Sequence, residues 1–393
     1  MAKSGAENES VVDAKALFGQ TPEQLCALVE SLGLKKYRAL QLLDALYKQR
    51  VEQLDQITTL PTDLRTRLID EGYSISLPEI AQTAHSTDGT ERYLMRMADG
   101  ETVETVWMPD GDGSEPEDDI SEPVAVEEEN GYKRATICIS SQVGCAVNCQ
   151  FCLTARLGQR RNLTAGEIAG QVAAVLNRQR VRIGSGRGVE TPSRINLVFM
   201  GMGEPFLNYD AFMQSVHVLR AMGIPEARMT VSTSGIEPAI RRFAAEPIRP
   251  KLALSLNASN DAVRERIMPV TRKWNIAALL AAVQSIPLGK REYVTFEYVL
   301  LGGVNDQPQH AREVLALLAG MKAKVNLIVW NPVPGVDFRE PSPADIAVFH
   351  RMLIDGGIPT FTRRSRGRDI YAACGQLKRT VDAPAPLVEI ATG

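Results

Sequence analysis

The chain has 393 residues, of which 44% are hydrophobic and 23% are charged, so it is long enough for a barrel-sized core and a smaller module. Its N-terminal sequence lacks the basic and apolar regions of a signal peptide. No apolar run approaches the roughly 18 residues that span a bilayer. We therefore expect a two-domain, cytoplasmic protein that does not enter a membrane.

The formal net charge of −3 conceals one strongly acidic segment. Ten acidic residues and no basic residue lie from Asp110 to Glu129, and without those ten charges the formal net charge is +7. A like-charged segment with Gly and Pro predicts a solvated, disordered insertion. The basic remainder is consistent with a nucleic-acid partner or with an ordinary solvated surface. Its arginines gather at Arg156, Arg160, Arg161, Arg363, Arg364, Arg366 and Arg368.

Residues 1–88 are predicted to form a helical accessory domain. The sequence from Thr21 to Gln24 is a capping box with proline at the first helical position, and leucine and valine follow at helical spacing. Further helices are predicted over 37–47 and 64–69. This domain is either a generic helical cap or an RNA-contacting appendage. Its exposed basic residues are predicted to be Lys35, Lys36, Arg38, Lys48 and Arg50.

A β-hairpin extension is predicted next, within residues 89–133. Residues 92–97 and 102–108 alternate in polarity around the turn at Asp99-Gly100. The acidic segment follows the second of these strands. It therefore separates the hairpin from the rest of the chain.

From residue 134 the pattern changes to alternating strands and helices. The clearest helix begins at a capping box, Thr164 to Glu167. The six strand-like apolar runs are 135–140, 195–200, 229–232, 252–256, 294–300 and 325–330. Six such units predict an α/β fold, a partial (β/α)6 TIM-like barrel over 134–380. Residues 381–393 are expected to form a flexible tail.

Three of the six cysteines, Cys145, Cys149 and Cys152, lie in one short loop with the spacing C-x3-C-x2-C. Three thiolates can hold three corners of a cubane [4Fe–4S] cluster and leave one iron open to bind a small molecule. The alternative is a structural zinc, but such sites use four Cys or His ligands. The nearest histidines are about 60 residues or more away. The spacing therefore favours an open iron–sulfur cluster.

Polar and glycine residues follow five of the six predicted strands. In barrels of this kind, catalytic residues lie at the C-terminal ends of the strands. The sequence therefore predicts one site, built from all of these strand ends. They are the cysteine loop, Gly201 to Pro205, Ser232 to Gly235, Ser255 to Asn257, and Asn331-Pro332.

These motifs resemble the radical S-adenosylmethionine (radical SAM) superfamily and, more closely, the RlmN methyltransferases. The resemblance extends over nearly the whole chain and is carried by residues 140–145, 200–205, 330–332 and 373–377. It implies methylation of C2 of one adenosine in the peptidyl-transferase centre of 23S rRNA and of the adenosine 3′ of the anticodon in tRNAs. C2 is electron-poor and does not attack an electrophilic methyl group, which agrees with a radical route.

The resemblance also implies the cofactors and partners. These are one [4Fe–4S] cluster on the three cysteines, two S-adenosylmethionine molecules consumed per methylation, and an electron donor such as flavodoxin or ferredoxin. We expect a monomer. One position departs from the family, because Asn257 stands where members usually have histidine. The residues that match the family's cofactor contacts are Gly203, Glu204, Ser232, Ser255, Leu256, Asn257 and Asn331.

Three further residues match catalytic positions of the family. Cys374 matches the cysteine that carries a methyl group on sulfur. Cys138 matches the thiol that attacks that sulfur, forming a transient disulfide and releasing the product. Glu104 matches the proposed acceptor of the C2 proton. Without the resemblance, Cys138 would be interpreted as a small buried hydrophobic residue and Glu104 as an exposed strand residue.

Two alternatives remain from the sequence. One is a C8-specific adenosine methyltransferase of the related resistance type, which shares the cluster and both redox cysteines. The other is a non-catalytic RNA-binding protein with a structural metal. Cys26, among leucines on the first predicted helix, is interpreted as core.

Overall fold

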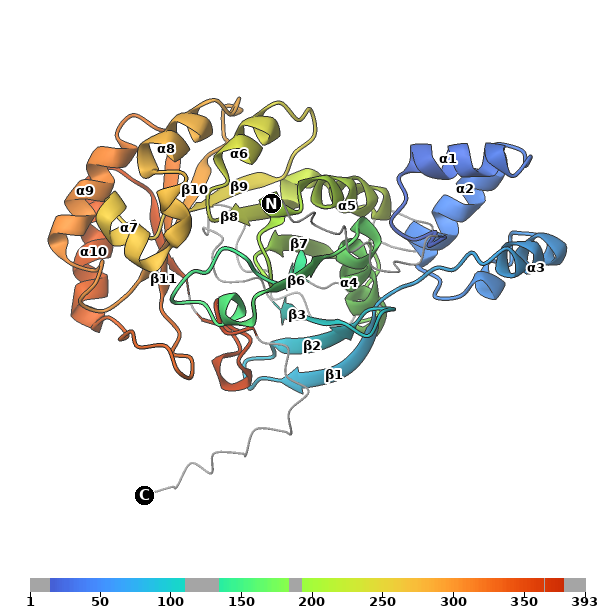
Figure 1. The fold of residues 1–393 in the computed structure, drawn as a ribbon, viewed down its shortest axis with the longest axis horizontal. Helices are drawn as coiled ribbons and strands as arrows, with labels where there is room; N and C mark the ends of the chain where they lie inside the picture. The colour runs from blue at the N-terminus through green and yellow to red at the C-terminus, as the bar shows by residue number, and fades with distance from the viewer. Residues whose placement is uncertain (1–14, 110–133, 184–192, 364, 378–393) are drawn as a thin grey trace, which may run out of the picture.

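The computed structural model describes residues 15–109, 134–183, 193–363 and 365–377. The fold in these ranges is a single large sheet with helices on its outer face and a separate group of N-terminal helices (Figure 1). Within them, no helix is long and apolar enough to cross a membrane. The predictions for the acidic segment 110–129 and the tail 381–393 lie outside the described residues.

The N-terminal module contains the three helices expected from the sequence. They are α1 (Pro22–Ser31), α2 (Tyr37–Leu43) and α3 (Thr62–Asp70), with a π-helical turn at Asp44–Gln49 and a 3-10 turn at Leu54–Gln56. The predicted capping box opens α1, because the Gln24 amide donates to Thr21 Oγ1 (3.3 Å) and the Thr21 amide donates to Gln24 Oε1 (2.8 Å). The predicted second helix extends beyond α2 as the π-helical turn.

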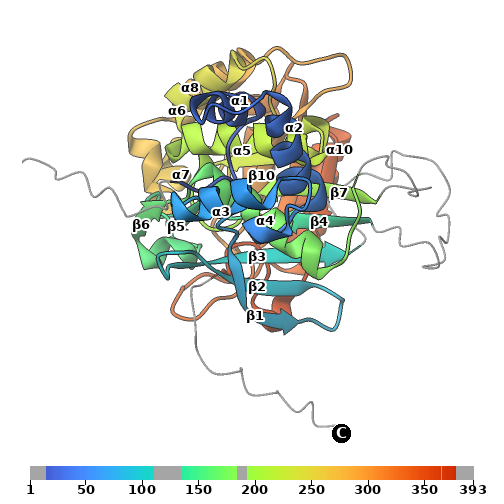
Figure 2. The same cartoon turned by 90° about the vertical axis from the view of Figure 1, so that its right-hand side faces the viewer.

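The module packs against the helices α4 (Ala165–Arg178) and α5 (Tyr209–Met222), and Figure 2 shows it in front of them. The chain before α1 crosses the start of α4 so closely that a Cβ at Gly19 or Gly166 would overlap the other segment's backbone. Arg50 Nε donates to Asn177 Oδ1 (2.9 Å), and Gln214 Nε2 donates to the Gly19 carbonyl (2.8 Å). These contacts fix the module to the barrel.

The main sheet has ten strands in the order β1-β2-β3-β4-β7-β8-β9-β10-β11-β12, antiparallel as far as β4 and parallel from β4 onward. The order is linear, so within the described residues the sheet remains an open, partial barrel. The antiparallel strands are β1 (Glu79–His85), β2 (Glu91–Arg96) and β3 (Thr102–Pro109). The parallel strands are β4 (Arg134–Cys138), β7 (Arg194–Phe199), β8 (Met229–Thr233), β9 (Lys251–Ser255), β10 (Val294–Leu300), β11 (Ala323–Val329) and β12 (Thr360–Arg363).

All six predicted parallel strands are present. The two predicted hairpin strands correspond to β2 and β3. The sequence analysis did not predict β1 or β12. β1 is polar and half-exposed along its length, and β12 is only four residues long, so neither has a strong apolar signal. β1 falls within the range 1–88 that was predicted to be helical, but it pairs with β2. The predicted hairpin of β2 and β3 is therefore present, and β1 extends it to three antiparallel strands.

Helices connect the parallel strands in six β/α units, as predicted, with two helices after β9, and the strand β12 follows the helix of the sixth unit. Besides α4 and α5, they are α6 (Glu237–Ala244), α7 (Asp261–Ile267), α8 (Ile276–Gln284), α9 (Pro308–Leu318) and α10 (Pro343–Asp355). Short 3-10 turns lie at Thr154–Leu157, Pro205–Leu207, Glu226–Arg228, Pro269–Arg272 and Arg368–Ile370, and the strands β5 (Gln142–Gly144) and β6 (Gln159–Asn162) form a small separate sheet. The C-terminal ends of the parallel strands therefore meet at one edge of the barrel.

Candidate active site

The three-cysteine loop leaves β5 and lies over the C-terminal ends of the strands. Cys145, Cys149 and Cys152 line one cavity that contains about 920 Å³ of space not filled by atoms, part of it open to solvent. Neighbouring elements hold the loop, because Trp330 Nε1 donates to the Phe151 carbonyl (3.2 Å) and the Gln150 amide donates to the Ile267 carbonyl (2.9 Å). The volume is of the size that binds a small organic cofactor.

Burial raises the pKa of all three thiols of the loop, that of Cys145 to about 12. Without a metal these thiols are therefore protonated at neutral pH, and metal binding would release their protons. Among the described residues, no three His, Cys, Asp or Glu side chains converge on one point as ligands of a single ion. Three thiolates on three different irons of a cubane have no need to converge in this way.

Glu204 is held rigidly in the cavity wall. Its Oε2 accepts from the amide and the hydroxyl of Ser234 (both 2.7 Å), and its Oε1 accepts from the Phe206 amide (3.0 Å). Burial raises the pKa of its carboxyl, whereas these hydrogen bonds lower it. Gly203 adopts a φ of +100°, and a Cβ there would lie 2.6 Å from Gln142 Cβ. The glycine is therefore required by packing against β5, in addition to any approach to a ligand.

Two strand-end serines lie side by side in the same cavity. Ser232 Oγ and Ser255 Oγ are 3.2 Å apart and both residues line the cavity. Leu256 is buried and is not one of the described residues that line it. Its amide donates to the Glu297 carbonyl (3.0 Å). Leu256 therefore supports the site by linking two strand ends and does not face the cavity.

Asn257 lines the cavity, but its amide group is used to join two strand ends. Its Oδ1 accepts from the Val299 amide (2.9 Å), and its Nδ2 lies 3.2 Å from Met268 Sδ. Its φ of +56° is in the left-handed region, which asparagine tolerates better than most residues. At this position, where the resemblance implied histidine, the backbone conformation therefore suits asparagine.

Arg264 is a buried cation of the site that the sequence analysis did not identify. Its guanidinium donates to the carbonyls of Ser234 (2.6 Å), Leu256 (3.0 Å) and Ser255 (3.1 Å) and to the Thr271 hydroxyl (2.9 Å). Burial lowers its pKa to about 10, so it remains charged at neutral pH. Its charge favours the thiolate of Cys149. It lies in the charge-rich helix α7, and only the tertiary structure reveals that it is buried.

A second, smaller cavity joins the first at Cys374. Cys138 lines this second cavity, and Cys374 lines both cavities. Asn331 also lines both, and its Nδ2 donates to the Cys374 carbonyl (3.3 Å). The structure thus brings the two predicted redox cysteines to one cavity, which connects with that of the cysteine loop.

Glu104 lies on β3, one strand away from Cys138. It is buried, and its Oε1 is 3.0 Å from Arg92 Nη1. Val106, two residues along β3, pairs with Cys138, so Glu104 and Cys138 share one face of the sheet. Glu104 is not among the described residues that line either cavity.

The loop that carries Cys374 is anchored to the cysteine loop. The Leu153 amide donates to the Gly375 carbonyl (2.8 Å), and Thr154 Oγ1 donates to the Leu377 carbonyl (2.9 Å). These bonds fix the Cys374 loop against the segment that immediately follows Cys152.

The turn between β1 and β2 holds the other end of the Cys374 loop. Asp369 accepts hydrogen bonds from the Ser86 hydroxyl (2.6 Å) and the Thr87 amide (3.2 Å), and Asp88 accepts one from the Gly367 amide (3.0 Å). Desolvation raises the pKa of Asp88, but hydrogen bonds from Thr90 and Gly367 outweigh it and hold that pKa at about 2. The hydrogen bond from the Gly367 amide to Asp88 is therefore fully present above about pH 4 and is lost as the pH falls towards 2.

Comparisons with known proteins agree with this geometry. Residues 139–315 match the family model of the radical SAM superfamily, and residues 15–72 match that of the ribosomal RNA large subunit methyltransferase N-terminal domain. The chain is 56% identical over 353 residues to a probable dual-specificity RNA methyltransferase RlmN of Koribacter versatilis, covering 90% of this chain and 98% of that protein. It is 40% identical over 368 residues to the dual-specificity RNA methyltransferase RlmN of Anaeromyxobacter dehalogenans, covering 93% and 92%.

A solved structure is similar over the same extent. The crystal structure of a radical SAM methyltransferase from Sphaerobacter thermophilus superposes with a TM-score of 0.79 at 39% identity, covering 93% of this chain and 99% of that one. The fold and the three-cysteine loop define a radical SAM protein. Within that class, the chain belongs to the RlmN family.

Radical SAM proteins hold a [4Fe–4S] cluster and S-adenosylmethionine, and the residues of this chain fit both. The three thiols supply the cluster's ligands and leave one iron open. Asn331 Oδ1 is buried and has no hydrogen-bond partner among the described residues, so an acceptor is available in the cavity for a donor group of the ligand.

Proposed function

We propose that this protein methylates C2 of adenosine in 23S rRNA and of the adenosine 3′ of the anticodon in tRNAs. The observation that carries the proposal is that Cys374 lines both the cysteine-loop cavity and the cavity of Cys138. A methyl relay needs one sulfur that reaches first the cofactor and then the thiol that releases the product, which is Cys138 in this proposal. The relatives named dual-specificity RNA methyltransferases support the choice of substrates.

We assign the cofactor contacts to residues that line the larger cavity. Cys145, Cys149 and Cys152 would hold the cluster, and Glu204 would face the ammonium group of S-adenosylmethionine with Gly203 beside it. When bound, the cluster supplies the electron that cleaves S-adenosylmethionine to methionine and a 5′-deoxyadenosyl radical. The remaining contacts are assigned to Ser232, Ser255, Asn257 and Asn331. Leu256, which does not line the cavity, is assigned a supporting position through its amide, which donates to the Glu297 carbonyl.

The relay then follows from the two redox cysteines. Cys374 accepts a methyl group by displacement from a first S-adenosylmethionine, and a hydrogen atom of that methyl group is removed by the radical from a second one. The carbon-centred radical on Cys374 adds to C2 of the base, and the Glu104 carboxylate accepts the C2 proton. The Cys138 thiolate attacks the Cys374 sulfur, so that a disulfide forms as the carbon–sulfur bond to the product breaks. The unpaired electron would return to the cluster, and the released methylene carbon takes a proton to become the methyl group of the product.

The test is mass spectrometry of rRNA and tRNA nucleosides from cells with and without this protein. We expect 2-methyladenosine in both RNA classes only when the protein is present. A loss of 8-methyladenosine instead would identify the C8-specific alternative, and unchanged nucleosides would contradict the proposal.

The proposal has consequences for partners. Cleavage of S-adenosylmethionine consumes an electron, so we propose a low-potential donor such as flavodoxin or ferredoxin. We further propose that the protein acts as a monomer in the cytoplasm, where its RNA substrates are. The N-terminal module, fixed against α4 and α5, is proposed to contact RNA through its basic residues.

Asp369→Ala removes two of the hydrogen bonds that anchor the Cys374 loop. Because the loop must present Cys374 to both cavities, we expect the rate of RNA methylation to fall by about tenfold. Cluster absorbance should be unchanged, and limited proteolysis within 365–377 should be faster. Asp210→Ala, which removes an exposed partner of Arg242 on α5, is the matched control. A full methylation rate with unchanged proteolysis would show that the anchor does not matter.

Shortening the acidic segment 110–129 tests its predicted role as a tolerated surface insertion. We expect methylation to persist, because lengthening or shortening a surface loop changes the free energy of folding little. Removal of ten negative charges should tighten RNA binding at low salt, an effect that weakens as salt is raised. Loss of the cluster or of the folded state, measured by absorbance and circular dichroism, would show that the segment is structural.

A further inference from the structure

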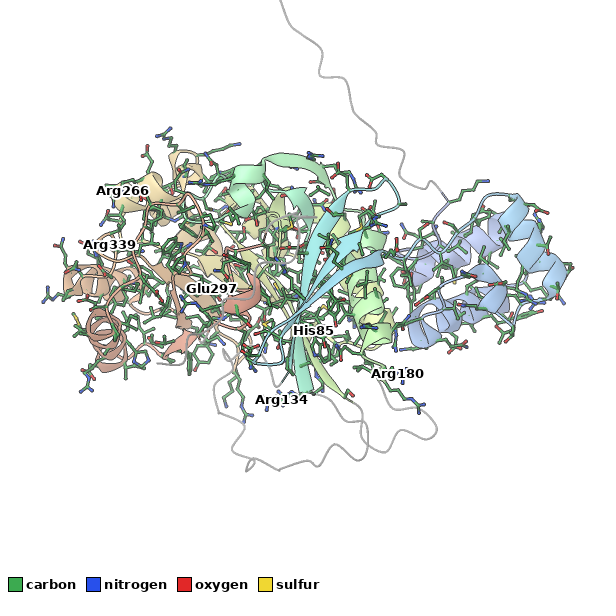
Figure 3. The ribbon with its side chains drawn as sticks, turned by 90° about the horizontal axis from the view of Figure 1, so that it is seen from below. His85, Arg134, Arg180, Arg266, Glu297 and Arg339 are labelled. Carbon is green, nitrogen blue, oxygen red and sulfur yellow. The ribbon has the colours of Figure 1, made fainter. Side chains whose placement is uncertain are left out.

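A third cavity lies inside the barrel at the opposite end from the active site. It contains about 1580 Å³ of space not filled by atoms, part of it open to solvent. Its wall includes the first residues of parallel strands, such as Arg134 of β4 and Lys251 of β9, whereas the active site is lined from the last residues of the strands. Met200 and Glu297 line both this cavity and the active-site cavity and therefore separate them. Figure 3 labels Glu297 in the centre of the barrel and Arg134 at its edge.

The mouth of this rear cavity is strongly cationic. Among the described residues that line it, the two acidic ones each lie near an arginine, because Glu292 is 3.6 Å from Arg249 and Glu297 is 3.8 Å from Arg363. Several like charges around one opening attract an anionic ligand, and arginine suits phosphate particularly well. The basic residues that line the cavity within the described ranges are Arg134, Arg194, Arg228, Lys251, Arg291 and Lys324.

Three of these cations are available to a ligand. Arg228, Lys251 and Arg291 are exposed, and none of them makes an ion pair within the part of the chain that the structure describes. Arg228 immediately precedes β8, Lys251 begins β9 and Arg291 lies before β10, and these three strands are neighbours in the sheet. The sheet therefore gathers on one rim charges that are far apart in the sequence.

The interior of the rear cavity is polar, although the interior of a TIM-like barrel is ordinarily packed with branched apolar side chains. Thr136 is 1% exposed and Asn326 is 5% exposed, and both line the cavity. Thr136 Oγ1 and Asn326 Oδ1 have no hydrogen-bond partner among the described residues. Buried polar atoms are ordinarily paired, so these two positions are suited to a hydroxyl or amino group of a ligand.

Two aromatic side chains complete the wall. Tyr293, 47% exposed, lies before β10, and Phe361 lies on β12, and both line the cavity. Exposed aromatic rings beside cations are the surfaces on which proteins stack nucleobases. Cations for phosphate, polar atoms for sugar hydroxyls and rings for a base are thus present in one cavity.

We propose that the rear cavity binds a nucleoside phosphate, separately from the active site. The same chemistry is offered by a free mononucleotide and by the 5′-phosphorylated end of an RNA strand. Phosphate would lie against Arg228, Lys251 and Arg291, and the sugar or base would donate to Asn326 Oδ1. The proposal concerns a site distinct from the methylation site, and it does not depend on which RNA is methylated.

The test is isothermal titration calorimetry of the cluster-loaded protein with two probes. The probes are uridine 5′-monophosphate and 5′-phosphorylated hexauridylate. Uridine is chosen because it lacks the adenine of S-adenosylmethionine. R228E/K251E reverses two exposed charges of the rim and should weaken binding by about tenfold or more. R312E/R351E makes the same charge change on the exposed faces of α9 and α10, away from the cavity, and should bind as the wild type does.

A second variant tests the interior. Thr136→Val keeps the shape of the side chain and removes the hydroxyl, so we expect a loss of affinity of about threefold to fivefold. A free nucleotide would be established as the ligand if the mononucleotide binds the wild type and R312E/R351E equally well but binds R228E/K251E more weakly. The same pattern for hexauridylate alone would establish an RNA end. Absence of saturable binding of either probe to the wild type, or equal affinity in R228E/K251E, would overturn the proposal.

Discussion

Replacing any one of Cys145, Cys149 or Cys152 with alanine is expected to abolish cluster absorbance and cleavage of S-adenosylmethionine together. Each thiol is a separate corner ligand, so a single loss leaves only two protein ligands for the cubane. The three side chains line one cavity and no other described cysteine except Cys374 does so. Reconstituted wild type should contain about four irons and four sulfides per chain, whereas a structural zinc site would contain about one zinc.

Cys26→Ala is the matched control for this experiment. Cys26 lies on α1 of the N-terminal module and is packed against the hydrophobic core, far from the cysteine loop in the fold (Figure 1). We expect its cluster content and cleavage rate to equal those of the wild type. A variant of the cysteine loop that retained both cluster absorbance and cleavage would disprove the assignment of that residue as a ligand.

The positions of six parallel strands could be predicted because their sequences are apolar and most are followed by polar ends. β10 is buried along its whole length, and the runs that became β4, β7 and β11 were equally clear. The edge strands β1 and β12 were missed because an edge strand needs no continuous apolar run. The same apolar signals predicted that the strand ends would converge, and the cavity at Glu204 and Ser232 is where they meet.

The environment of individual site residues could not be predicted in this way. Arg264 lies in a helix rich in charged residues, and only packing against the carbonyls of Ser234 and Ser255 makes it a buried cation. The hydrogen bonds from Ser86 and Thr87 to Asp369 join residues more than 280 positions apart. The rear cavity depends in the same way on sheet register, which places Thr230 of β8 beside Lys251 of β9.

Cys374→Ala is expected to keep the cluster but transfer no methyl group. The substitution removes the methyl acceptor and leaves the three cluster ligands and the serines of the cofactor cavity in place. Cluster absorbance should therefore match the wild type, while methylated adenosine should be undetectable by mass spectrometry. Methyl transfer by this variant at an appreciable rate would exclude Cys374 as the relay.

Cys138→Ala is expected to stop the reaction one step later, with RNA bound covalently to the protein. Cys138 and Cys374 line one cavity, so methylation of Cys374 and addition to the base can proceed without Cys138, but no thiol remains to attack the sulfur. Protein purified from cells should carry a nuclease-sensitive mass increase, and a Cys138→Ala/Cys374→Ala double variant should carry none. Normal turnover of Cys138→Ala without attached RNA would show that resolution does not use this thiol, whatever the similarity of the chain to its family.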